Sequence, residues 1–192
     1  MDAPLFEIAD FELMRLAGEG NERAFEILIE RHQALVIGTV GRMLGGFEGA
    51  EDIAQQVFVR AWRSADRYRP EAKFTTWLMT IARNLVFNEI KRRGKVKWSS
   101  MENEAGVTRE FVDARSVDGS GALSEREVQD AISQAIADLP EMQRMALVLR
   151  RYEDLPYEEI AAILGITLPA VKSLIFRARE ELKKVLKPLL ER

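Results

Sequence analysis

The chain has 192 residues, which is enough for one large or two small domains. It contains no cysteine and a single histidine, His32, which excludes disulfides, thiolate metal sites and a histidine metal cluster. The N-terminus has no basic segment followed by an apolar run, and no apolar stretch approaches the roughly 18 residues of a membrane helix. We therefore expect a soluble, cytoplasmic protein without a cofactor.

Helical patterns begin near the N-terminus. Asp10 is suited to cap a short helix that ends at Gly18 or Gly20, and Asn21 is suited to cap a longer one that runs to Leu44. His32 lies near the apolar stripe of this second helix. Because no serine or cysteine partner pattern accompanies it, we interpret it as structural rather than catalytic.

The next predicted helix spans residues 48–64 and is strongly two-sided. Its apolar side carries Ile53, Val57, Phe58 and Ala61, and its outer side carries Glu51, Asp52, Gln55, Gln56, Arg60 and Arg63. The helix dipole alone favours acids at the start and arginines at the end, so an ordinary solvated face is one interpretation. A docking surface is the other, and composition does not decide between them.

A connector with Pro70 covers residues 65–73, and Tyr68 with its flanking arginines is expected to be exposed there. The helix predicted over 74–93 places Trp77, Thr80, Asn84, Asn88 and Lys91 opposite its apolar side. Aromatic rings beside amides and a basic helix end are suited to unpaired bases, which stack on rings and expose their edges. Packing of Trp77 against the connector is an equally good interpretation.

Charge is distributed unevenly. The net charge of −3 argues against a nucleic-acid-binding protein, but six basic residues and one acid lie between Arg83 and Lys97. From Ser99 to Glu125 the balance reverses, with six acids against two bases and few periodic apolar residues. This composition predicts a flexible acidic linker between two helical domains.

Helices resume after the linker, over about 124–139 and 140–152. The stretch 156–182 then predicts two short helices with a sharp turn at Gly165, the pattern of a helix-turn-helix. On the last helix, Lys172, Ser173, Phe176 and Arg177 share a polar face with further basic residues. An aromatic residue on a wet basic face favours contact with base methyls and phosphates in a DNA groove over a merely solvated helix.

Three blocks in this order resemble the extracytoplasmic-function class of bacterial sigma factors: GAEDIAQQVFVRAW at 49–62, FTTWLMTIARNLVFNEIKRR at 74–93, and LPEMQRMALVLRRYEDLPYEEIAAILGITLPAVKSLIFRAREEL at 139–182. The resemblance implies an all-α fold with sigma domain 2 at 1–95, a flexible acidic linker at 96–124, and sigma domain 4 with its helix-turn-helix at 125–192. It implies no catalytic activity. Such a protein binds core RNA polymerase, directs initiation at promoters with −35 and −10 elements, assists DNA melting, and is typically controlled by an anti-sigma factor.

The resemblance also implies roles for individual residues. The polymerase clamp would be contacted by Asp52, Gln55, Gln56 and Arg60. The −10 strand would be held by Tyr68, Lys73, Trp77 and Asn84, and the −35 element by Arg150, Lys172, Ser173, Phe176 and Arg177. The linker would thread toward the RNA exit channel.

Two other functions are compatible with parts of the sequence. A stand-alone helix-turn-helix regulator would bind duplex DNA without polymerase, and would not need the Trp77 and Asn84 face. A nuclease would need a carboxylate cluster, for which Glu48, Glu51 and Asp52 are the candidates, but acids are expected at a helix start in any case. If the two domains fold onto each other, we expect the face from Lys172 to Arg177 to be buried against domain 2 or a partner.

Overall fold

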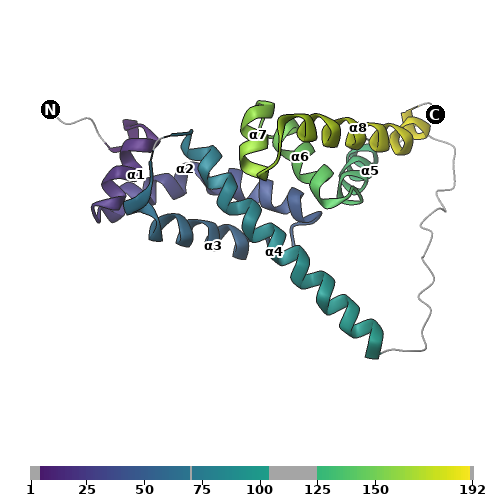
Figure 1. Cartoon of the computed structure of the whole chain (residues 1–192), viewed down its shortest axis with the longest axis horizontal. Helices are drawn as coiled ribbons and strands as arrows, with labels where there is room; N and C mark the ends of the chain where they lie inside the picture. The colour runs from purple at the N-terminus through teal and green to yellow at the C-terminus, as the bar shows by residue number, and fades with distance from the viewer. Residues whose placement is uncertain (1–4, 70, 104–124, 191–192) are drawn as a thin grey trace.

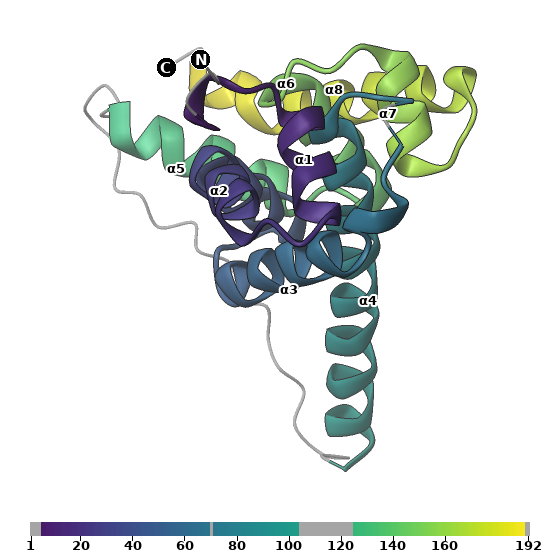
Figure 2. The ribbon, with the colours of Figure 1, turned by 90° about the vertical axis from the view of Figure 1, so that its left-hand side faces the viewer.

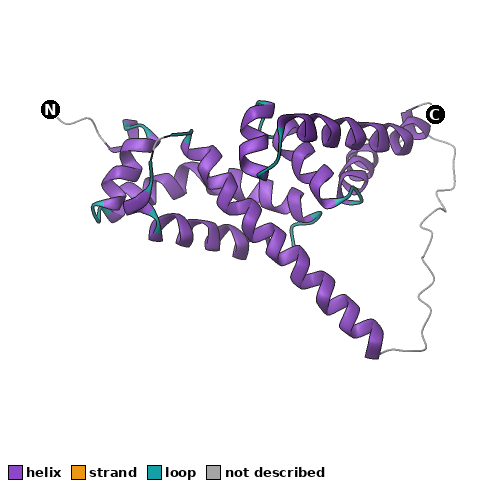
Figure 3. Cartoon of the chain, in the orientation of Figure 1, coloured by secondary structure: helices purple, strands orange, loops and turns teal. Residues whose placement is uncertain are grey.

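The computed structural model describes residues 5–69, 71–103 and 125–190, and within these ranges every regular element is helical (Figure 3). This confirms the all-α prediction. In chain order the elements are η1 (Leu5–Glu7), α1 (Asp10–Gly18), α2 (Glu22–Leu44), α3 (Ala50–Arg63), η2 (Ala65–Arg67), α4 (Phe74–Asn103), α5 (Glu125–Ala137), α6 (Glu141–Arg151), α7 (Tyr157–Leu164) and α8 (Leu168–Leu190).

The N-terminal half packs α1, α3 and α4 around α2 (Figure 1). The Asn21 side chain caps α2 as predicted, because its Oδ1 accepts a hydrogen bond of 3.0 Å from the Ala24 amide. Gly45 ends α2 in the left-handed conformation, at φ 83°. The predicted cap of α1 is wrong: Ala9 occupies the cap position, and Asp10 instead accepts hydrogen bonds from Arg31 and His32.

Helix α4 is longer than predicted. It continues past Gly94 to Asn103, because an isolated glycine weakens a helix without ending it. The predicted linker at 96–124 is therefore helical over its first residues, and the rest of the linker, 104–124, lies outside the described residues. Figure 2 shows the C-terminal part of α4 extending alone beyond the other helices.

The C-terminal half packs α5, α6 and α7 against α8. Its interior is formed by apolar side chains that are fully or almost fully buried: Met145, Val148, Leu149, Ile160, Ile163, Val171, Ile175 and Ala178. This half also touches the first half, since α6 and α5 contact α2 and α7 contacts α4 (Figure 2). The buried residues of both halves consequently form one continuous hydrophobic cluster.

No single helix in the described part of the chain is long and apolar enough to cross a membrane. Helices α7 and α8 pass such a test only when taken together, as a pair bent by 100°.

Candidate nucleic-acid interface

The turn between α7 and α8 has the geometry of a helix-turn-helix. Gly165 adopts φ 66° and ψ 38°, and the Ile166 amide donates to the Ala161 carbonyl at 3.1 Å, which closes the end of α7. The bend of 100° between the two helices lies within the range of such motifs. Ile160 and Val171 are fully buried between them, so the opposite side of α8 is left free.

That free side of α8 carries the residues predicted to contact the −35 element. Lys172, Ser173 and Arg177 are exposed, and the Phe176 ring is 64% exposed. The contact between the two halves of the chain does not cover this face. The expected burial of this face against domain 2 is therefore wrong, because the first half is contacted by α5, α6 and α7 instead. Its burial against a partner stays a prediction.

Arg150 is more restrained than the α8 residues. Its guanidinium donates to the Leu155 carbonyl at 3.0 Å, lies 3.2 Å from the Asp154 carboxylate, and sits over the Tyr157 ring at 5.6 Å from the centroid. These contacts fix it at the start of the segment that leads into α7. A phosphate reaching Arg150 would meet a preorganised guanidinium with a third of its side chain exposed.

The connector and the start of α4 differ from the prediction at one residue. Tyr68 was expected to be exposed but is 8% exposed, because its ring packs edge-on against Trp77, with the centroids 5.0 Å apart, and against Phe74. Trp77 is half-buried by the same contact, so it packs against the connector. The Tyr68 hydroxyl is buried without a hydrogen-bond partner in the described structure, and burial raises its pKa.

The two other residues predicted to hold the −10 strand are accessible. Lys73 is exposed just before α4 begins, and Asn84 is exposed within α4. Asn84 lies at the edge of a shallow hollow between α3 and α4, which Arg60, Arg63, Ser64 and Ile81 also line. The hollow brings a predicted −10 residue, Asn84, next to a predicted polymerase contact, Arg60.

Helix α3 exposes every side chain that is predicted to contact the polymerase. Asp52, Gln55, Gln56 and Arg60 are all exposed, whereas Ile53, Val57, Phe58 and Ala61 are buried against the core. Val59 stands 48% exposed on the outer side. The outer side of α3 therefore combines carboxylate, amide and guanidinium groups with one partly exposed apolar side chain.

The carboxylates in the described ranges are arranged for ion pairing rather than for metal binding. No group of three or more His, Asp or Glu side chains in those ranges could hold a metal ion. Glu89 on α4 accepts hydrogen bonds from Arg92 and Arg93, which lower its pKa to about 2.

Sequence analysis missed the residues that join the two halves of the chain. Arg144 is 6% exposed, and its guanidinium donates to the carbonyls of Met43, Ala137 and Leu139 at 2.9, 2.5 and 3.0 Å. Glu159 on α7 contacts Thr76 and Lys73 on α4. The contact of Arg144 could have been suspected, because an arginine stands there among the apolar residues of a helix. The contact of Glu159 could not, because acids are common in the first turn of any helix.

The C-terminal half carries a helix-turn-helix, and the N-terminal half carries a helix, α3, with an exposed polar face. This combination is typical of a protein that reads DNA while bound to a larger protein assembly. Comparison with known families agrees. Residues 28–96 match the family model for sigma-70 region 2, and residues 129–182 match the model for sigma-70 region 4.

Curated relatives cover nearly the whole chain. The RNA polymerase sigma-H factor of Pseudomonas aeruginosa is 35% identical over 94% of this chain and 95% of its own length. The ECF RNA polymerase sigma-E factor of Escherichia coli is 32% identical over 97% and 98%. The chain therefore belongs to the extracytoplasmic-function class of the sigma-70 family, and it directs transcription initiation without being an enzyme.

Two solved structures share the fold. CnrH in complex with the cytosolic domain of CnrY has a TM-score of 0.65 at 24% identity, and the match covers 94% of this chain and 99% of that one. The sigma factor RpoE of Bartonella quintana, in complex with the anti-sigma factor NepR, has a TM-score of 0.65 at 26% identity, with 85% and 96% covered. The family-model matches and the curated relatives set aside the stand-alone regulator and the nuclease.

Proposed function

We propose that this sigma factor divides its work among three helices, and that α3 is the polymerase-binding helix. The observation that carries the proposal is the outer face of α3, on which Asp52, Gln55, Gln56 and Arg60 are all exposed around Val59. Protein–protein interfaces are enriched in arginine and have a polar rim, which the exposed groups of α3 could supply. The domains in this proposal are domain 2 at 1–95 and domain 4 at 125–192, and the linker between them at 96–124 begins within α4, which runs to Asn103.

In this proposal α8 reads the −35 element as an intact duplex. Lys172 and Arg177 would neutralise phosphates and contact base edges, and Phe176 would pack against thymine methyl groups. Ser173 adds a hydroxyl that donates or accepts. The exposure of all four side chains on one face of a rigid helix supports this role.

The −10 element would be bound as a single strand on α4 and the connector. Asn84 offers an amide to base edges, Lys73 offers a cation to phosphate, and the half-buried Trp77 offers one ring edge. Tyr68 would not contact the strand directly, because its ring is buried against Trp77 and Phe74. It would instead hold Trp77 in position.

An anti-sigma factor is the partner that we propose for regulation, and the cytoplasm is the location. Support comes from the Bartonella quintana relative, whose solved structure is a complex with the anti-sigma factor NepR. A protein that must reach core polymerase and promoter DNA works where both are present.

The test is a pull-down of purified bacterial core RNA polymerase by the full chain. We expect the wild type to bind and the double variant Asp52→Ala, Gln56→Ala to bind at least tenfold more weakly. The matched control is Asp130→Ala, Gln134→Ala on α5, which removes the same two residue types at the same helical spacing from exposed positions. Equal retention of polymerase by the two double variants would remove α3 from this role.

A further inference from the structure

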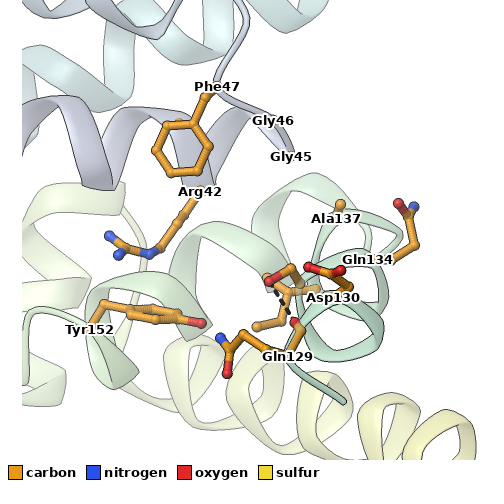
Figure 4. Close-up of a pocket in the computed structure, with 12 residues that line it drawn as sticks. Arg42, Gly45, Gly46, Phe47, Gln129, Asp130, Gln134, Ala137 and Tyr152 are labelled. Carbon is orange, nitrogen blue, oxygen red and sulfur yellow. Dashed lines mark hydrogen bonds between the residues drawn. The ribbon is translucent and has the colours of Figure 1, made fainter. Parts of the chain in front are cut away.

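A hollow of about 450 Å³ lies where the C-terminal half meets the end of α2 (Figure 4). Arg42 of α2 and Phe47 of the following loop line one side of it. Gln129 of α5 and Tyr152, which follows α6, line the other. Among the described residues that line the hollow, none is assigned to the polymerase or to promoter DNA. Its volume lies in the range of pockets that bind small molecules.

A buried arginine joins the two sides of the hollow. Arg144 of α6 donates to the Met43 carbonyl at the end of α2 and to the Ala137 carbonyl at the end of α5. The buried Thr39 hydroxyl of α2 also donates to Glu153, in the segment after α6. Hydrogen bonds from buried groups therefore hold both sides in place, which lowers the ordering cost of binding a ligand between them.

Arg42 presents a guanidinium that is already oriented. Its guanidinium carbon lies 4.2 Å from the centroid of the Tyr152 ring, and the side chain is half-buried. Within the described part of the chain, no hydrogen bond or ion pair engages this guanidinium. A ring contact restrains a guanidinium without using its N–H donors, so the donors of Arg42 are available to a phosphate or a carboxylate.

Phe47 presents an aromatic ring at the same hollow. The ring packs against Gly41 of α2, yet the side chain is 62% exposed. A ring that is packed on one side and exposed on the other offers a surface on which a nucleobase can stack. Gln129, which is exposed on α5, adds an amide that can both donate and accept hydrogen bonds at the edge of a base.

Two glycines within α2 make room for these side chains. A Cβ atom at Gly38 would lie 2.9 Å from Arg42 Nη1, and one at Gly41 would lie 2.5 Å from the Phe47 ring. Neither glycine adopts the left-handed conformation that would require it, and a glycine inside a helix costs stability relative to alanine. Helix α2 therefore loses stability at the two positions where Arg42 and Phe47 need space, which favours a functional use of this arrangement.

A guanidinium, a ring face and an amide together suit a nucleotide. The phosphate pairs with the guanidinium, the base stacks on the ring, and the base edge meets the amide. An inorganic anion would use Arg42 alone. Asp130 also lines the hollow, and its carboxylate weighs against a strongly acidic peptide as the ligand.

We propose that this hollow is a binding site for a nucleoside monophosphate, with the phosphate on Arg42, the base on Phe47 and the base edge at Gln129. Tyr152 is a positioning residue, since it holds Arg42. Because both halves line the hollow, the bound nucleotide stabilises the contact between them. The proposal is independent of the roles proposed for α3, α4 and α8.

The test is isothermal titration calorimetry of the full chain with AMP, GMP, CMP and UMP. We expect saturable binding of at least one of them with a Kd below about 1 mM, and a Tm that rises with its concentration. The parent nucleoside lacks the phosphate, and ribose 5-phosphate lacks the base. Each should bind at least about tenfold more weakly than the nucleotide.

Variants separate the two main contacts. Arg42→Gln should reduce nucleotide affinity about tenfold and remove most of the preference for nucleotide over nucleoside. Arg23→Gln, at an exposed arginine on the same helix, should leave both unchanged. Phe47→Leu should reduce nucleotide affinity about fivefold and leave the affinity for ribose 5-phosphate unchanged. Phe11→Leu, at a ring that is 53% exposed on α1, should change neither affinity.

Absence of saturable binding by all four nucleotides up to about 10 mM would overturn the proposal. Equal affinities for ribose 5-phosphate and the nucleotide would reduce the hollow to an anion site and overturn the assignment to nucleotides. Equal affinities of Arg42→Gln and Arg23→Gln, or an equal loss of nucleotide and nucleoside in Arg42→Gln, would overturn the phosphate contact. Binding of core polymerase depends on α3, so failure there contradicts the proposed function and not this site.

Discussion

Arg144 should be the most sensitive single position at the contact between the two halves. In Arg144→Met the side chain keeps an unbranched apolar stem but is shorter by the end of the guanidinium, and it loses every hydrogen bond that the guanidinium makes. Two of the three acceptors, the carbonyls of Met43 and Leu139, are bonded in buried surroundings. Leaving a buried acceptor without a partner costs about 1–3 kcal/mol each.

One opposing effect reduces that cost. Burial removes the charged guanidinium of Arg144 from water, which lowers its pKa, and methionine does not carry this desolvation cost. We therefore expect a net loss of about 3 kcal/mol in the free energy of unfolding. For a chain of this length that corresponds to a fall in Tm of about 6–12 °C.

The assay is thermal and urea denaturation followed by circular dichroism. Arg151→Met serves as the control, because Arg151 lies on the same helix, is exposed, and undergoes the same chemical change. A surface substitution of this kind should stay within about 0.5 kcal/mol of the wild type. If the two variants denatured together, the buried bonds of Arg144 would not be a stabilising contact and the reasoning would fail.

Three further substitutions test other parts of the structure. Phe176→Ala should leave the Tm unchanged because the ring is 64% exposed, and it should reduce run-off transcription from a −35-dependent promoter about tenfold. Phe47→Ala, at a ring that is 62% exposed in the other half, should not reduce transcription. Gly165→Ala should lower the free energy of unfolding by about 1–2 kcal/mol because an L side chain is disfavoured at φ 66°, whereas Gly46→Ala, with open space around it, should not. Glu89→Gln should remove a stabilisation of at most about 1 kcal/mol. In the wild type this stabilisation is present above pH 4.5 and is lost as the pH falls toward the folded pKa of about 2. The free energies of unfolding of wild type and variant should therefore converge near pH 2.

Much of the fold could be predicted from the sequence because local rules decide it. Asn21 and Gly45 bound α2 as capping chemistry requires, and the two sides of α3 separate as its periodicity predicts. The end of α4 could not be found in this way, since Gly94 lies within the helix, and an isolated glycine weakens a helix without ending it.

The site residues were predictable where exposure follows from periodicity and not where it depends on distant packing. Phe176 is exposed as its place on the helical wheel indicates. Tyr68 is buried because Phe74 and Trp77, from the following helix, close over it, and no pattern within the connector contains that information. The same holds for Thr76, which is buried and donates a hydrogen bond to Glu159, 83 residues later in the chain.

The contact between the two halves is a contact within one chain. The segment 104–124, which lies outside the described residues, joins the two halves, so the closed arrangement, with α5 and α6 against α2 and α7 against α4, forms within a single molecule. Closure is then a unimolecular event, with an effective concentration set by this tether rather than by the amount of protein. Raising expression or diluting the cell extract would leave the closed fraction the same, and release would depend on the affinity of whatever ligand prefers the open chain.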